Sequence, residues 1–375
     1  MMKELKSHKS GISRRKFIGG TAAAAAITMV PFSVSCQGAA TPAPVESGKP
    51  NSNFGGVQIG AITYSWRSMP GGVENIIKYC REANVSSIEL MSGDLETFLG
   101  APQNPMTAIM AAQRQQAPPP PPPPPAQQPG ARPAGQGAAP AAAQGGGFQR
   151  RQLTPEQEAA VAKYGEDLKQ WRVSLPEAKV LEAKKLFNDA GINVHIVKFS
   201  PSRWSDEEID YAFRTAKAMG AKGVTEEIGE EAVKRLAPFA EKHGMYAIFH
   251  NHAQFATPGF SYDPFLAVSP AVMMNFDAGH FFGSTGIHPN EMIEKYHERI
   301  FSLHIKDKTG PNTEPANTNQ VWGQGEVPLK DVLLLIKEKK WPIYCDIELE
   351  YQIAPWSNAV KETKTCVGYA RQILM

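Results

Sequence analysis

Short apolar runs alternate with amphipathic segments along most of the chain. Eight runs have the length and the β-branched or aromatic composition of buried strands: 57–65, 86–91, 193–199, 223–228, 246–250, 272–277, 300–305 and 343–349. Between them, apolar residues recur every three to four positions, which predicts helices over 74–83, 176–189, 206–219, 230–243, 289–299 and 329–339. Strands that alternate with helices indicate parallel βαβ units. Eight such units predict an α/β fold closed into a single (β/α)₈ TIM barrel.

A proline-rich segment interrupts this pattern after the second strand. Residues 101–150 contain 13 of the 31 prolines, eight of them consecutive at 118–125, and are otherwise mostly Ala, Gln and Gly. Such a composition cannot bury a core, so we expect a disordered insertion over 101–152. Without this segment and the first 54 residues, about 270 residues remain for a barrel over 55–375, close to the ~250 that one barrel needs.

The N-terminus has the layout of an export signal. Ser13-Arg14-Arg15-Lys16-Phe17 precedes a weakly apolar run over 18–34, and this arrangement resembles a twin-arginine signal peptide. We therefore predict a signal over 1–35, a flexible tether over 36–54, and a periplasmic protein that engages the twin-arginine export machinery. Cys36 follows a loose version of a lipoprotein cleavage box, so the sequence leaves open a lipid anchor there. It also leaves open assembly into a homo-oligomer.

The formal net charge of +2 averages over unlike segments. Residues 1–35 carry a net +5 and residues 101–152 a net +4, which leaves −7 for the remainder. A mildly acidic barrel favours buried carboxylates or cationic ligands over a phosphate backbone. We therefore expect no nucleic-acid partner.

Polar residues end several of the expected strands. Glu227, Asp277, His304 and Glu348 end the fourth, sixth, seventh and eighth. Because the carboxyl ends of parallel strands converge on one mouth of a barrel, these four side chains can meet. Three carboxylates and one imidazole suit Mn²⁺, Mg²⁺, Co²⁺ or Zn²⁺, and without a cation the carboxylates would raise one another's pKa. The sequence thus predicts a divalent metal site with these ligands.

Two histidines are expected beside this site. His250 and His252 alternate at the end of the fifth strand, so both face the same side. With Glu227 and Glu348, they are the candidates for the catalytic acid and base.

Two further residues are expected at the same mouth. Lys306 shares a face with His304 and can neutralise a developing oxyanion, or form a salt bridge with Glu348 or Glu350. His280 follows Asp277 by three residues and can orient that carboxylate or contact a substrate.

These motifs resemble the xylose isomerase-like TIM barrel superfamily, often described as sugar phosphate isomerases/epimerases. The resemblance covers about 57–375 without the insertion. It rests on Phe276-Asp277-Ala278-Gly279-His280, Leu303-His304-Ile305-Lys306-Asp307, Trp322-Gly323-Gln324-Gly325-Glu326 and Ile347-Glu348. It implies Asp277, His304 and Glu348 as metal ligands.

The fourth ligand differs between branches of this superfamily. Epimerase-like members place a Glu on the fifth strand, where this chain has His250. The His-Asn-His run at 250–252 is instead similar to the inosose dehydratase branch, where the fourth strand supplies the Glu. That similarity implies Glu227, with Glu226 or His250 as the alternatives.

The resemblance also implies a reaction class. A metal that binds two adjacent oxygens of an unphosphorylated keto sugar or cyclitol acidifies the C–H bond beside the carbonyl. The resulting enediolate leads to an isomerase or epimerase, or to a dehydratase or lyase on 3-keto-glycosides or inososes if a β-substituent leaves. Trp66 and Trp322 are candidates for stacking on the carbohydrate.

Two other functions are weighed against this reaction. A non-catalytic, exported sugar-binding barrel is the alternative from a different functional class. A DNA-repair role is not expected, because residues 317–320 lack the extra His and Asp ligands of apurinic endonucleases.

Overall fold

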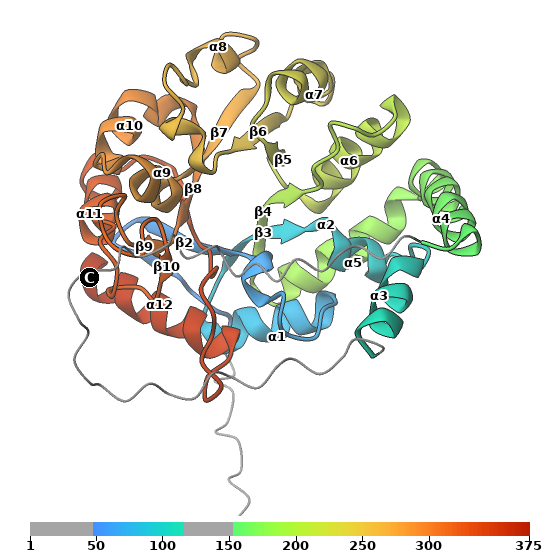
Figure 1. Cartoon of the computed structure of the whole chain (residues 1–375), viewed down its shortest axis with the longest axis horizontal. Coiled ribbons are helices and arrows are strands. Elements are labelled where there is room, and N and C mark those ends of the chain that lie inside the picture. Colours follow the sequence, from blue (N-terminus) through green and yellow to red (C-terminus); the bar gives the residue numbers. More distant parts are fainter. Residues whose placement is uncertain (1–47, 116–152) are drawn as a thin grey trace, which may run out of the picture. The chain divides into compact units, whose positions relative to one another are not determined.

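Eight parallel strands close into a barrel, as the sequence predicts (Figure 1). Each strand pairs with the next along the chain, and the last one pairs with the first. The strands are β2 (Val57–Ile62), β3 (Ser87–Met91), β4 (Asn193–Lys198), β5 (Gly223–Glu227), β6 (Tyr246–His250), β7 (Val272–Asp277), β8 (Ile300–Ile305) and β11 (Tyr344–Ile347). The fold class is therefore confirmed.

The structure is a computed structural model that describes residues 48–115 and 153–375. All of these belong to one unit, Val45–Met375. The expected export signal, Cys36, most of the tether and most of the expected insertion lie outside the described residues. Among the residues that are described, no helix is both long enough and apolar enough to cross a membrane.

Helices follow the strands and lie around the barrel (Figure 1). The expected ones are α1 (Val73–Ala83), α5 (Glu177–Asp189), α6 (Asp206–Met219), α7 (Glu230–His243), α10 (Pro289–Tyr296) and α11 (Leu329–Lys339). Gly220 and Gly244 end α6 and α7 with φ angles of 90° and 62°, which only glycine adopts without strain.

Other elements were not expected from the sequence. The helices are α2 (Ser92–Phe98), α4 (Pro155–Ser174), α8 (Asp263–Leu266), α9 (Ala278–Thr285) and α12 (Ala359–Leu374). The short strands are β1 (Asn53–Phe54), β9 (Asp307–Lys308) and β10 (Asn319–Gln320). Three 3₁₀ turns complete the set: η1 (Thr63–Trp66), η2 (Ala253–Ala256) and η3 (His297–Arg299).

The expected insertion begins with an ordered helix. Residues 101–152 were expected to be disordered throughout, but α3 (Pro105–Gln115) forms within them and packs against α4. Apart from its first proline, α3 consists largely of Ala, Met and Gln, which favour helix and outweigh the proline-rich character of the neighbouring segment.

A buried ion pair attaches α4 to the barrel. Arg172 near the end of α4 places its Nε atom 2.8 Å from Oε1 of Glu96 on α2 and its Nη1 atom 3.1 Å from Oε1 of Glu208 on α6. Its guanidinium also lies 3.5 Å from the centre of the Trp204 ring. The chain segments on both sides of the expected insertion are therefore joined by this residue.

Candidate metal centre at the barrel mouth

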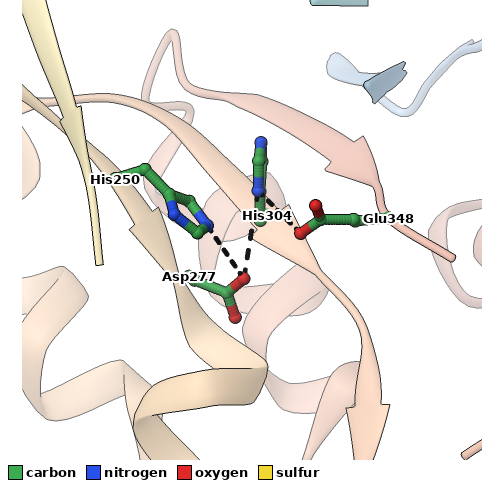
Figure 2. A group of neighbouring side chains, drawn as sticks. All are labelled: His250, Asp277, His304 and Glu348. Atoms are coloured by element: carbon green, nitrogen blue, oxygen red, sulfur yellow. Dashed lines mark hydrogen bonds and ion pairs between the residues drawn. The ribbon is translucent and has the colours of Figure 1, made fainter. Parts of the chain in front are cut away.

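Four buried side chains meet at the carboxyl ends of adjacent strands. His250 ends β6, Asp277 ends β7, His304 lies on β8, and Glu348 directly follows β11. One nitrogen or oxygen of each lies within 4.8 Å of one from every other member (Figure 2). The strand register brings them together, because Asp277 pairs with His304 and the backbone N–H of Glu348 donates to the carbonyl of Ile305 on β8.

The atoms of this cluster face one another closely. His304 Nδ1 lies 2.9 Å from Glu348 Oε2 and 3.9 Å from Asp277 Oδ2, and His250 Nε2 lies 3.2 Å from the same Asp277 oxygen (Figure 2). The second oxygen of Asp277 is used elsewhere, since Oδ1 accepts the backbone N–H of His280 and caps α9. One carboxylate thus starts a helix and contributes to the cluster.

Glu227, expected as the fourth ligand, lies outside the four-residue cluster. β6 lies between β5 and β7, so His250 is the neighbour of Asp277 and Glu227 is one strand further away. Glu226, the alternative, points elsewhere and accepts backbone N–H groups of Ser202 and Glu227. The cluster therefore has two imidazoles and two carboxylates instead of one imidazole and three carboxylates.

Glu227 forms a second group with two histidines. Its Oε2 atom lies 3.2 Å from Nδ1 of His250 and 3.2 Å from Nδ1 of His252. Burial works to raise the pKa of Glu227, but hydrogen bonds from both rings lower that pKa below its usual range. The hydrogen bond to Glu227 raises the pKa of His252. Both Glu227 and His252 are about half exposed, so this pair faces solvent at the mouth.

Lys306 lies at the edge of the cluster as a buried cation. Its Nζ atom is 2.8 Å from Asp277 Oδ2, 2.6 Å from Glu348 Oε2 and 2.6 Å from Glu350 Oε2. Burial works to lower the pKa of Lys306, but these carboxylates raise that pKa well above its usual value. Lys306 is therefore a permanent positive charge, and it makes both of the salt bridges that the sequence left as alternatives.

His280 borders the cluster on the side of α9. Its Nε2 atom lies 3.2 Å from Glu350 Oε2 and 4.0 Å from Asp277 Oδ2. Burial lowers the pKa of His280, which favours a neutral ring.

The two tryptophans expected to contact substrate are buried and pack against α12. The Trp66 ring nitrogen donates to Thr363 Oγ1 at 3.1 Å, and the Trp322 ring packs edge-on against Tyr369. Both are less than a tenth exposed. Strand β2 ends before Trp66, which falls in η1 and turns outward to α12, so neither ring belongs to the cluster.

Two residues beside the site were missed in the sequence. Glu89 lies in the middle of β3, fully buried, with Oε2 2.7 Å from His304 Nε2. Lys198 ends β4 with Nζ 2.6 Å from Glu227 Oε1. The signal for Glu89 was present, because a carboxylate between Ile88 and Leu90 interrupts an otherwise apolar strand.

The donor set fits a divalent cation. Nitrogen and carboxylate donors together suit Zn²⁺, Mn²⁺ or Co²⁺. His304 Nδ1 is buried and makes no hydrogen bond within the described residues, although it lies only 2.9 Å from Glu348 Oε2, which is paired with Lys306. Burial works to lower the pKa of His304, yet Glu348 and Glu89 raise it well above its usual value. The site therefore attracts positive charge.

Comparisons with known proteins agree with this architecture. A xylose isomerase domain protein from Alicyclobacillus acidocaldarius is 11% identical, with a TM-score of 0.51 over 84% of this chain and 98% of that chain. The probable 3-DHS dehydratase AsbF from Bacillus anthracis is 12% identical, with a TM-score of 0.50 over 83% of this chain and 98% of that chain. These likenesses show the fold. No curated protein matches the sequence.

A family model matches the larger part of the chain directly. The family is described as xylose isomerase-like TIM barrel, and the match covers residues 159–366. This range contains all four residues of the cluster. The match confirms the resemblance found in the sequence, and the chain belongs to the xylose isomerase-like TIM barrel family.

Proposed function

We propose that this barrel is a divalent-metal-dependent isomerase or epimerase acting on an unphosphorylated keto sugar or a related carbohydrate. The observation that carries the proposal is the buried cluster of His250, Asp277, His304 and Glu348 at the mouth of the barrel. A divalent ion held by these residues supplies Lewis acidity to a carbonyl oxygen. An interior barrel site with perturbed pKa values also fits a catalytic role better than a structural one.

The residues around the cluster suit proton transfer beside a carbonyl. Glu227 and His252 are partly exposed, so both can reach a bound substrate. We assign removal of the carbon-bound proton to Glu227, which is ionised, and return of a proton to His252, whose pKa is raised. Lys306 stabilises the negative charge that develops on the substrate oxygen. Glu348 is buried and paired with Lys306, so we assign it to metal binding.

The same groups also support a dehydratase or lyase. Loss of a β-substituent from the enediolate would give elimination, for example on a 3-keto-glycoside or an inosose. Solved proteins with this fold include a xylose isomerase domain protein and a probable dehydratase, so the fold is compatible with both outcomes. Product analysis separates them, because elimination releases water or an alcohol and epimerisation releases nothing.

Metal analysis and then proton exchange test the proposal. We expect the purified protein to bind about one Mn²⁺, Co²⁺ or Zn²⁺, and to exchange the proton beside the carbonyl when keto sugars are incubated with it in D₂O. Glu348→Gln and Asp277→Asn should abolish both properties. Glu230→Gln serves as the matched control, because Glu230 is an exposed carboxylate at the start of α7.

Two results would contradict the proposal in different ways. Metal binding without exchange on any carbohydrate of the panel would favour the non-catalytic sugar-binding barrel. Exchange that persists in Glu348→Gln or Asp277→Asn would exclude the cluster as the active site.

We also propose that the protein is exported to the periplasm through its N-terminal signal. The support is Ser13-Arg14-Arg15-Lys16-Phe17 with an apolar run directly after it. Replacing both arginines by lysine should retain the uncleaved chain in the cytoplasm, as measured by fractionation and N-terminal sequencing. Recovery of this variant in the periplasm, processed like the wild type, would refute the twin-arginine route. A separate variant, Cys36→Ser, would show whether membrane association depends on a lipid.

A further inference from the structure

A charged side chain lies inside the barrel, one layer below the four-residue cluster at its mouth. Glu89 is fully buried in the middle of β3, between Ile88 and Leu90. The interior of such a barrel is normally filled by branched apolar residues, and a buried carboxylate is costly unless it is well paired. Its partners therefore indicate what it does.

Three other strands, none of them adjacent to β3, supply these partners. Thr225 on β5 donates its hydroxyl to Oε1 at 2.6 Å. Asn275 on β7 donates its amide to Oε2 at 2.9 Å, and His304 on β8 places Nε2 2.7 Å from the same oxygen. Glu89 is thus held by side chains from three strands.

The Glu89 carboxylate fixes the orientation of the Asn275 amide. The Glu89 carboxylate can only accept, so the NH₂ group of Asn275 points to it, and Asn275 Oδ1 then accepts the Ser302 hydroxyl at 2.9 Å. This NH₂ group also lies 3.0 Å from His304 Nε2. An unprotonated Nε2 would accept from Asn275, but it would then face the Glu89 carboxylate at 2.7 Å with two lone pairs opposed. A proton on Nε2 removes this repulsion and gives Glu89 a third donor.

We propose that Glu89 is a positioning residue that keeps the proton of His304 on Nε2 and so presents the Nδ1 lone pair to the metal. A second observation supports this assignment. His304 Nδ1 faces Asp277 and Glu348 but makes no hydrogen bond within the described residues, so it is available to bind a cation. A carboxylate behind a ligating histidine fixes both its tautomer and its ring orientation. The inference rests on the metal-binding part of the proposed function.

Glu89→Gln tests the role with little change in volume. Loss of the ionised carboxylate behind His304 should weaken binding of Zn²⁺ or Mn²⁺ by about 10- to 100-fold, as measured by competition with a chromophoric chelator. Nitrogen-15 NMR of the Zn²⁺-loaded protein should show the Nε2–H tautomer of His304 in the wild type. In the variant, the imidazole signal should broaden or shift to a mixture of tautomers.

Glu96→Gln is the matched control, because Glu96 is also a buried, paired carboxylate but lies on α2 away from the cluster. It should lower thermal stability and leave metal affinity unchanged.

Unchanged affinity and an unchanged tautomer in Glu89→Gln would overturn the inference while the proposed function stands. If the wild type binds no metal, the proposed function itself fails. If Glu89→Gln does not fold, the wild-type spectrum decides, because an Nδ1–H tautomer of His304 in the Zn²⁺-loaded protein would refute the assignment.

Discussion

At the scale of single residues, His250 uses both of its ring nitrogens. Nε2 faces Asp277 in the buried cluster, and Nδ1 faces Glu227 in the partly exposed group. One ring therefore joins the residues that can hold a cation to the residues that can move a proton. This arrangement assigns different roles to His250 and Glu227, which the sequence left as alternatives for one position.

Two matched substitutions test this division. His250→Gln should weaken metal binding strongly, by roughly 100-fold or more, because it removes one of four ligands from a buried site. Glu227→Gln should change metal affinity only a few-fold but lower turnover by about 10²- to 10⁴-fold, as expected for loss of a general base. Calorimetric metal titration and steady-state kinetics measure the two effects separately.

The opposite pattern would restore Glu227 as the fourth ligand. In that case the Glu227→Gln variant would no longer bind the metal, and the His250→Gln variant would still bind it but turn over substrate more slowly. Lys234→Gln, on the exposed face of α7, should behave as the wild type in both measurements.

The sequence predicted some of these residues and missed others for identifiable reasons. Asp277, His304 and Glu348 were recognisable because each ends an apolar run at the mouth of a barrel. Glu89 was missed because it lies within a strand, where only the strand register reveals its partners. Trp66 and Trp322 were assigned to the substrate because the sequence does not show that α12 covers them.

At the scale of elements, α4 is attached to the barrel by the buried Arg172 and by Trp171, whose ring packs edge-on against Tyr211 on α6. Its surface is largely exposed, and Arg172 is its buried residue. The pairing of Arg172 with Glu96 and Glu208 is therefore the main buried polar contact between this helix and the barrel.

Arg172→Met should destabilise the protein by about 3–5 kcal/mol, because it leaves the buried Glu96 and the partly buried Glu208 without their cationic partner. Lys163→Met on the same helix removes an exposed pair with Asp167 and should cost about 0.5 kcal/mol or less. Urea unfolding monitored by circular dichroism gives both values. Equal effects of the two substitutions would show that Arg172 does not anchor α4.

The predicted helices were those with a clear apolar face. α4 escaped prediction because it adjoins the proline-rich segment and its apolar stripe of Val161, Tyr164, Leu168 and Trp171 is narrow and only partly buried. α9 was missed because it starts directly at Asp277 with no polar linker after β7. All eight strands were recognisable because a parallel strand is buried on both faces and reads as a continuous apolar run.

At the scale of the whole molecule, we expect the barrel to fold without the proline-rich segment. α3 and α4 pack against each other, so the chain leaves and re-enters the barrel between two helices that are in contact. The entropy of closing a loop grows slowly with its length, by about 0.6 kcal/mol for each doubling. The length of the intervening segment therefore contributes little to folding.

A shortened chain should retain the site. We expect a variant that starts at residue 48, with residues 118–150 replaced by a short Gly-Ser linker, to unfold within a few degrees of the full chain. Its affinity for Mn²⁺ should be the same within about two-fold. Differential scanning calorimetry and metal titration check this, and loss of metal binding in a folded variant would assign the segment a direct role at the mouth.

The two oxygens of Asp277 give the site a property that neither contact has alone. Oδ1 caps α9 and Oδ2 faces the cluster, so one carboxylate serves a helix and a cation at the same time. A cation that binds beside Oδ2 acts on the same carboxylate that caps α9. Cation binding therefore changes the stability of the start of α9, and by thermodynamic reciprocity the stability of α9 changes the affinity for the cation. Cation binding at the site and the opening of α9 should therefore be linked equilibria, and we expect amide hydrogen exchange along α9 to slow when a divalent cation is added.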